Sequence, residues 1–226
     1  MNQSKHLNKV IKQNAVFIPL LPPEYQQVKY LQSTGTQGID TGVIIPTNYY
    51  RVECMLKCTE FTTGNMNTRF FGSQTSVVSI APWNDSGGSA SPFRALAVGN
   101  TWQFHLVEQT PTAKDVIYKI DLTADSGSLT GTYCGVTVNE TYGSTVKTTR
   151  SEGLFCNHAH GNIYDDAVNN QGASAIYYFR MHTARGLERN FIPCYRKSDN
   201  KPGMYDLVTN TFYTNIGTGD FIIGYE

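Results

Sequence analysis

Short stretches of alternating apolar and polar residues recur along this chain. The clearest is residues 51–58: one face carries Val52, Cys54, Leu56 and Cys58, and the other carries Arg51, Glu53 and Lys57. Because successive side chains of a strand point to opposite faces, this stretch predicts an antiparallel strand with one buried face. Further strands are predicted at residues 68–71, 77–81, 93–98, 102–108, 116–122, 131–139, 153–157 and 174–181.

Turn-forming residues separate these stretches at short intervals, at 84–88, 99–100, 125–127, 142–143 and 165–166. They are densest in residues 189–219, where turns are predicted at 198–200, Pro202-Gly203, Asn210 and 215–219, with strand segments at 205–208 and 211–213 between them. Gly and Asn tolerate positive φ, so this spacing predicts tight hairpins. Many short strands with frequent turns predict an all-β, two-sheet antiparallel jelly-roll sandwich. The one stretch with helix-like periodicity, residues 184–190, is too short to predict a helix.

Two parts of the chain differ in composition. Residues 1–22 are polar and basic, then apolar, then rich in proline, and they show no strand alternation. They predict an N-terminal arm that either attaches the protein to a partner or is a flexible leader. A secretion signal is disfavoured, because the apolar run is short, is broken by Pro19 and lacks a small-residue cleavage site. Residues 23–226 predict one domain, since sandwiches of this length commonly form a single unit.

The charge balance and the cysteines exclude several classes of protein. Eighteen basic residues balance eighteen acidic ones, which favours neither nucleic acid nor an anionic membrane as a partner. No segment approaches the roughly 20 apolar residues that cross a bilayer. The five cysteines form no CxxC pair, so a zinc site is not expected. They predict buried free thiols, as in a protein that folds in a reducing cytoplasm.

Both ends of the predicted domain carry recognisable motifs. Residues 21–42 read LPPEYQQVKYLQSTGTQGIDTG, and residues 191–219 contain FIPCYRK, GMYDLV, FYTN and GTG. Together they resemble a family of laminin-G-like, concanavalin A-type jelly-roll domains found in gut phage virion proteins and bacterial surface proteins. The resemblance implies two antiparallel sheets packed face to face and leaves the function open. The chain departs from the family in its leading arm and at residues 155–160, so no binding residue is transferred.

Metal binding and catalysis are both disfavoured. His158 and His160 with Asp165 and Asp166 could hold a metal ion, and the two aspartates with Asn169 and Asn170 could hold calcium, but neither set has the spacing of a known site. We therefore predict no metal and no cofactor. A glycosidase needs two carboxylates flanking the scissile bond, whereas Glu53, Glu108, Asp121 and Glu140 fall on different strands. No catalytic residue is assigned and the chain is not expected to be an enzyme.

Carbohydrate binding is the better hypothesis. A pyranose has an apolar face and a polar rim, which suits an aromatic side chain beside amides and carboxylates. Candidate residues are Trp83, Asn84, Asp85 and Trp102. The alternative for either tryptophan is a place in the core or on a sheet face. Elsewhere, alternation predicts Tyr177 and Phe179 on one face of their strand and Tyr178 on the other.

The function predicted from the arm, the free thiols and the resemblance is that of a phage virion structural protein, a capsid decoration, head fibre or tail-associated component. Residues 1–22 would contact other virion proteins, and the outward-facing domain would adhere to host-surface or mucosal glycans. We expect such a protein to be a homo-oligomer that is assembled in the bacterial cytoplasm and located in the virion. The alternative is a bacterial surface or secreted carbohydrate-binding module of lectin type.

Overall fold

The computed structural model describes residues 21–45, 49–59, 70–73, 79–81, 94–96, 104–106, 115–133, 135–141, 151–156 and 173–225. Within these ranges the chain forms strands and turns and no helix, so no helix there is long and apolar enough to span a membrane. Every strand pairing is antiparallel.

The strands form two sheets. The larger sheet has eleven strands: β1 (Tyr25–Gln27), β2 (Tyr30–Gln32), β4 (Tyr49–Cys58), β9 (Ile117–Asp125), β10 (Ser128–Tyr133), β11 (Val136–Thr141), β13 (Ser174–Thr183), β14 (Gly186–Arg196), β15 (Lys201–Asp206), β16 (Thr211–Thr214) and β17 (Ile222–Gly224). The smaller has six: β3 (Ile39–Ile44), β5 (Phe71–Gly72), β6 (Ser79–Ala81), β7 (Arg94–Leu96), β8 (Phe104–Leu106) and β12 (Ser151–Leu154).

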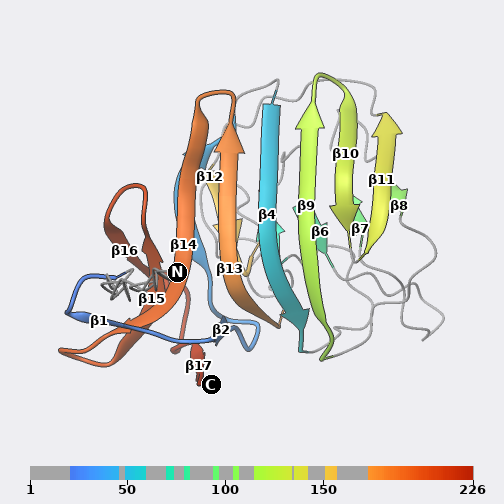
Figure 1. Ribbon diagram of the computed structural model, residues 1–226. Helices are drawn as coiled ribbons and strands as arrows, with labels where there is room; N and C mark the ends of the chain where they lie inside the picture. Colours follow the sequence, from blue (N-terminus) through green and yellow to red (C-terminus); the bar gives the residue numbers. More distant parts are fainter. Residues whose placement is uncertain are drawn as a thin grey trace, which may run out of the picture.

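The two sheets lie face to face, with the smaller sheet behind the larger one in Figure 1. The main core fills the space between them, where alternate side chains of both sheets are buried. Phe179 of β13 meets Phe71 of β5 edge to face, with ring centroids 4.8 Å apart and both side chains fully buried. The predicted all-β jelly-roll sandwich is thus confirmed.

Strand β4 shows how the sequence pattern produces this arrangement. Its side chains alternate between buried and half-buried along all ten residues, with Val52, Cys54, Leu56 and Cys58 in the core as predicted. The strand pairs with β9 on one side and β13 on the other. A central strand with one apolar and one polar face can bury only one of them, so the polar face of the larger sheet points outward.

Several predicted boundaries are wrong, each for a local reason. Residues 131–139 are not one strand, because β10 ends at Tyr133 and the chain reverses around Gly135, whose φ is +84°. Pro202 and Gly203 do not form a turn but lie within β15. There Gly203 is required by the neighbouring strand, since a Cβ would come within 2.3 Å of the Tyr213 carbonyl oxygen and 2.7 Å of the Phe212 ring. The turn instead follows β15, at residues 207–210. The helix-like stretch 184–190 forms no helix, as expected: residues 184–185 lie in a turn and β14 begins at Gly186.

A β-bulge in β13 overturns the prediction for its aromatic residues. Opposite β4, Ile176 pairs with Leu56 and Tyr178 pairs with Met55, so Tyr177 is an extra residue. A bulge lets two successive side chains share one side of the sheet. Tyr177 and Tyr178 are accordingly both half-buried on the outer face, while Phe179 remains in the core.

The first described residues are packed onto the domain. Leu21 is buried with Cys194 and Tyr205 in a small second cluster, and Tyr25 and Phe212 close it, with ring centroids 4.9 Å apart. Residues 1–20 of the predicted arm lie outside the described part of the chain.

Four of the five cysteines are described, and all four are buried free thiols, as predicted: Cys54, Cys58, Cys156 and Cys194. Burial raises the pKa of Cys156 and of Cys194 to about 12. At neutral pH these two thiols are protonated, which makes them poor nucleophiles. Their role is to fill the core.

Candidate functional site

The carbohydrate-binding candidates predicted from the sequence, Trp83, Asn84, Asp85 and Trp102, lie outside the described residues. The histidines and acids considered as metal ligands at 158–170 lie outside them too. Among the residues that are described, no group of three or more His, Cys, Asp or Glu side chains could hold a metal ion.

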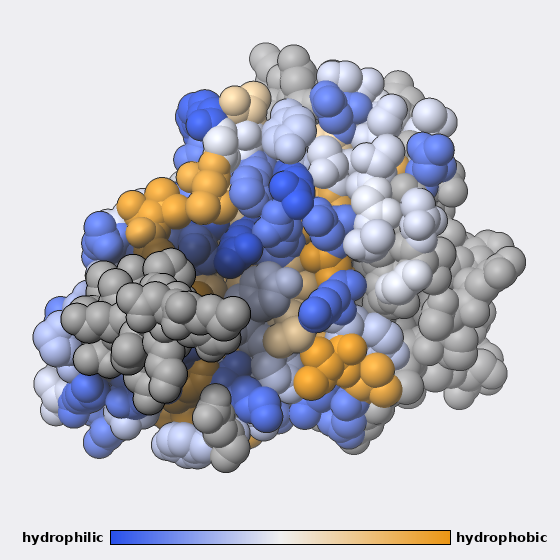
Figure 2. Space-filling model, in the orientation of Figure 1, coloured by the Kyte–Doolittle hydropathy of each residue, from blue (hydrophilic) through white to orange (hydrophobic). Residues whose placement is uncertain are grey.

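The outer face of the larger sheet has two chemically different halves. Figure 2 views it in the orientation of Figure 1 and shows polar surface over the upper part of β4 and β13 and an apolar patch over the lower ends of β4 and β9. Strand geometry explains this division: outward side chains two residues apart continue along one face. On β4 the outward row runs Arg51, Glu53, Met55 and Lys57. On β9 it runs Asp121, Lys119 and Ile117, so in the lower half of these two rows the apolar side chains lie beside lysines and no carboxylate.

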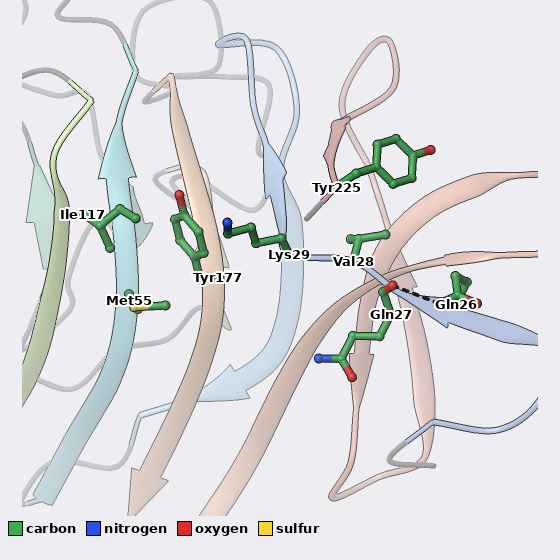
Figure 3. A pocket seen from close by; sticks show the side chains of 8 residues that line it. All are labelled: Gln26, Gln27, Val28, Lys29, Met55, Ile117, Tyr177 and Tyr225. Atoms are coloured by element: carbon green, nitrogen blue, oxygen red, sulfur yellow. Dashed lines mark hydrogen bonds between the residues drawn. The ribbon is translucent and has the colours of Figure 1, made fainter.

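The lower half contains a groove of about 650 Å³, which we call the tyrosine groove. It is lined by Gln26, Gln27, Val28, Lys29, Met55, Ile117, Tyr177 and Tyr225. The groove lies where the larger sheet divides. Strand β14 pairs with β13 as far as Phe179, then turns away to pair with β1, while β2 takes its place beside Ala175 and Ile176. The segment that links β1 to β2 forms the wall facing β13 (Figure 3).

Tyr177 is the central aromatic side chain of the groove. Its ring packs at a tilt against Tyr30, with centroids 5.1 Å apart. Figure 3 shows Met55 and Ile117 beside it on the sheet and Lys29 extending toward it from the opposite wall. Partial burial raises the pKa of the Tyr177 phenol, so the hydroxyl stays protonated at neutral pH and can both donate and accept a hydrogen bond.

The upper half holds a network that we call the charge cluster: Arg51, Glu53, Asp121, Arg180 and His182. Arg51 binds Asp121 in two places, at 2.8 Å through Nε and 2.9 Å through Nη2, and also pairs with Glu53 at 2.5 Å. Arg180 contacts Glu53 at 3.3 Å. The cluster is thus largely charge-compensated within itself.

His182 completes the charge cluster. Its Nε2 lies 3.7 Å from the Glu53 carboxylate. Burial lowers the pKa of His182 and outweighs the opposing effect of Glu53, so the imidazole is neutral at pH 7. Glu53 is therefore compensated by the two arginines rather than by this histidine.

The fold brings together two acids that the sequence places far apart. Glu53 and Asp121 face each other across β4 and β9, and with Lys119, Thr132 and Tyr178 they border a hollow of about 230 Å³. The hydrogen bonds from Arg51 lower the pKa of Asp121. A glycosidase acid needs a raised pKa in order to donate its proton, so Asp121 is tuned in the opposite direction. The pair is better suited to accepting hydrogen bonds from hydroxyl groups.

Comparison with known proteins gives a likeness in fold. No family model matches the chain, and no curated protein matches it. Among solved structures, it is similar to a "putative carbohydrate binding protein" from Bacteroides ovatus, with a TM-score of 0.59 and 13% sequence identity. The match covers 88% of this chain and 60% of that one, so this chain spans about three fifths of the length of its neighbour. At this identity the likeness shows a shared fold.

Sequence reasoning missed the tyrosine groove because five separate segments form it. Residues 26–29, 55, 117, 177 and 225 are distant along the chain, and only strand pairing brings them together. One signal in the sequence could have indicated the site. Tyr177 and Tyr178 are consecutive, so at least one of them has to lie on the outer face of the sheet, beside the polar outer face of β4. Without the bulge, alternation sends Tyr177 into the core.

Proposed function

We propose that this protein binds carbohydrate, and that the tyrosine groove is the binding site. The observation that carries the proposal is the groove itself, in which two tyrosine rings, three apolar side chains and several polar groups surround one open space. The fold shared with the Bacteroides ovatus protein supports it as well.

The groove matches the shape and chemistry of a sugar ring. A pyranose presents C–H groups on one face and hydroxyl groups around its rim. The Tyr177 ring, Met55 and Ile117 offer an apolar surface for the face, while the amides of Gln26 and Gln27 and the ammonium group of Lys29 can bind rim hydroxyls. Polar groups few in number among apolar ones are typical of small-molecule sites.

The adjacent hollow gives the site a direction. Tyr177 of the groove and Tyr178 of the hollow are consecutive, and Met55 of the groove and Glu53 of the hollow are successive outward residues of β4. The hollow is thus a neighbour of the tyrosine groove on the outer face of the larger sheet. A second sugar unit bound there would meet the acceptors Glu53, Asp121 and Thr132. We therefore expect oligosaccharides to bind more tightly than monosaccharides.

Tyr177→Ala is expected to weaken glycan binding by at least about tenfold, because removing an aromatic anchor at the centre of a site typically costs more than ~1.4 kcal/mol. The measurement is affinity electrophoresis or calorimetry with a glycan selected from an array. Tyr177→Phe keeps the ring and should retain most of the affinity. Tyr49→Ala, at the far end of β4, should bind as the wild type does. If Tyr177→Ala bound glycan as tightly as the wild type, the tyrosine groove would not be the binding site.

A more specific hypothesis is that this domain belongs to a phage virion protein. Residues 1–22 would attach it to other virion proteins, and it would be one subunit of a homo-oligomer. Its support is the family resemblance of the two end motifs and the unusual composition of the leading segment. Mass spectrometry of particles purified from an infected culture tests it. The chain should be found with its N-terminal segment intact. Its absence from particles, together with processing near residue 20, would favour a bacterial surface or secreted lectin instead.

A further inference from the structure

The tyrosine groove differs from the charge cluster in its electrostatics. Its eight lining residues include Lys29 and no aspartate or glutamate. Within the described part of the chain, the Lys29 ammonium makes neither an ion pair nor a side-chain hydrogen bond, whereas in the charge cluster each arginine has a carboxylate partner. Among the described residues, the positive charge in the groove therefore has no carboxylate partner.

A second lysine, Lys57, does not line the groove but packs on an aromatic ring behind it. Lys57 lies over the Tyr30 ring at 5.3 Å, and Tyr30 in turn packs on Tyr177. Lys57 has a distant partner in Asp115, at 3.7 Å, whose side chain is 60% exposed. Such an exposed contact is strongly screened by water, so it compensates the Lys57 charge only in part.

We propose that the tyrosine groove selects saccharides that carry a carboxylate. This inference rests on the proposed function and names its ligand class. With the apolar face of the sugar on Tyr177, a carboxylate on the ring would extend toward Lys29, which faces Tyr177 across the groove (Figure 3). The amide of Gln27, two residues before Lys29 on the same wall, can donate a hydrogen bond to the same group.

The arrangement fits an acidic sugar better than a polyanionic surface. Nucleic acid and anionic membranes are held by many basic residues over an extended area, whereas here one lysine lines the groove in a chain with no net charge. One ammonium group facing the Tyr177 ring matches one carboxylate per sugar unit.

The test uses calorimetry to compare polygalacturonate with its methyl-esterified form. The ester has the same sugar backbone and lacks the carboxylate charge. Hyaluronate and polysialate are two further carboxylated glycans, and comparing the three shows which acidic sugar the groove prefers. Dextran serves as the neutral glycan. We expect the wild type to bind at least one carboxylated glycan, and for polygalacturonate the methyl ester should bind more weakly. Raising NaCl from about 0.05 to 0.5 M should weaken this binding, because screening shortens the reach of charges.

Lys29→Gln is the discriminating variant. It should lower affinity for the carboxylated glycan about fivefold, since an exposed ion pair contributes up to about that factor. Binding of neutral glycans should fall less than that, because the glutamine amide can still donate a hydrogen bond to a hydroxyl group. Lys201→Gln is the matched control, because Lys201 pairs with Asp220 away from the groove. If polygalacturonate and its methyl ester bind equally, or if Lys29→Gln and the wild type bind the carboxylated glycan equally, the charge selectivity is overturned and carbohydrate binding is retained. The same conclusion follows if the protein binds dextran but none of the three acidic glycans. A protein that binds none of these glycans, nor any on an array, would overturn both proposals.

Discussion

Replacing Asp206 with alanine is expected to lower the free energy of unfolding by about 3–5 kcal/mol, the usual result of removing one partner from a buried charged network. The Asp206 side chain is fully buried. Its Oδ1 accepts hydrogen bonds from the backbone N–H groups of Asn190, at 2.7 Å, and Val208, at 3.1 Å. Its Oδ2 accepts from the N–H and the hydroxyl of Thr209. The carboxylate thereby ties β14 to the turn after β15.

Urea unfolding followed by fluorescence measures this effect. Arg189 lies 3.7 Å from Asp206 and would lose its carboxylate partner, which adds to the cost of the alanine variant. Asp206→Asn keeps one acceptor oxygen and should fall between alanine and wild type. Asp220→Ala, an exposed partner of Lys201, should change stability by less than about 1 kcal/mol. A loss that small for Asp206→Ala would mean that the turn does not depend on this carboxylate.

Phe179→Ala is expected to cost about 3–5 kcal/mol, because it deletes a fully buried ring and leaves a cavity between the two sheets. The ring of Phe71 would lose its edge-to-face partner across the core. Thermal or urea unfolding gives the value. In a double-mutant cycle, Phe71→Ala and Phe179→Ala should be non-additive, since the two rings are in contact.

Tyr178→Ala is the matched control for this position. One residue earlier in β13, Tyr178 is half-buried on the outer face, so its removal should cost less than about 1 kcal/mol. Tyr177→Ala should be similarly mild in stability, although it impairs glycan binding. If Tyr177→Ala were as destabilising as Phe179→Ala, the bulge that turns Tyr177 outward would be incorrect and strict alternation would hold.

The fold was predictable because its signals are local. The alternation of residues 51–58 and the turn residues at 125–127 and 198–200 each act within a few positions, and the structure confirms all three. Two errors arose where a distant strand decides the local structure. Gly203 provides room for the Phe212 ring rather than a turn, and the bulge at Tyr177 depends on pairing with β4.

The candidate site was less predictable than the fold. The groove requires β14 to leave β13 so that β2 can pair there. Pro193, two residues after the last pairing of β14 with β13, has no backbone N–H to donate and is a local mark of the divergence, but it does not indicate that β2 pairs there instead. The sequence pointed to Trp83 and Trp102, which lie outside the described residues. It did not point to Tyr177, because alternation places Tyr177 on the same face as Phe179 and therefore in the core.

Chemical-shift mapping of the ¹⁵N-labelled protein with an oligogalacturonate tests the proposed site most directly. We expect the largest shifts at Lys29, Met55 and Tyr177, with smaller ones extending to Glu53 and Asp121. Shifts confined to residues near Trp83 and Trp102, with the groove signals unmoved, would contradict the account and place saccharide binding elsewhere on the sandwich.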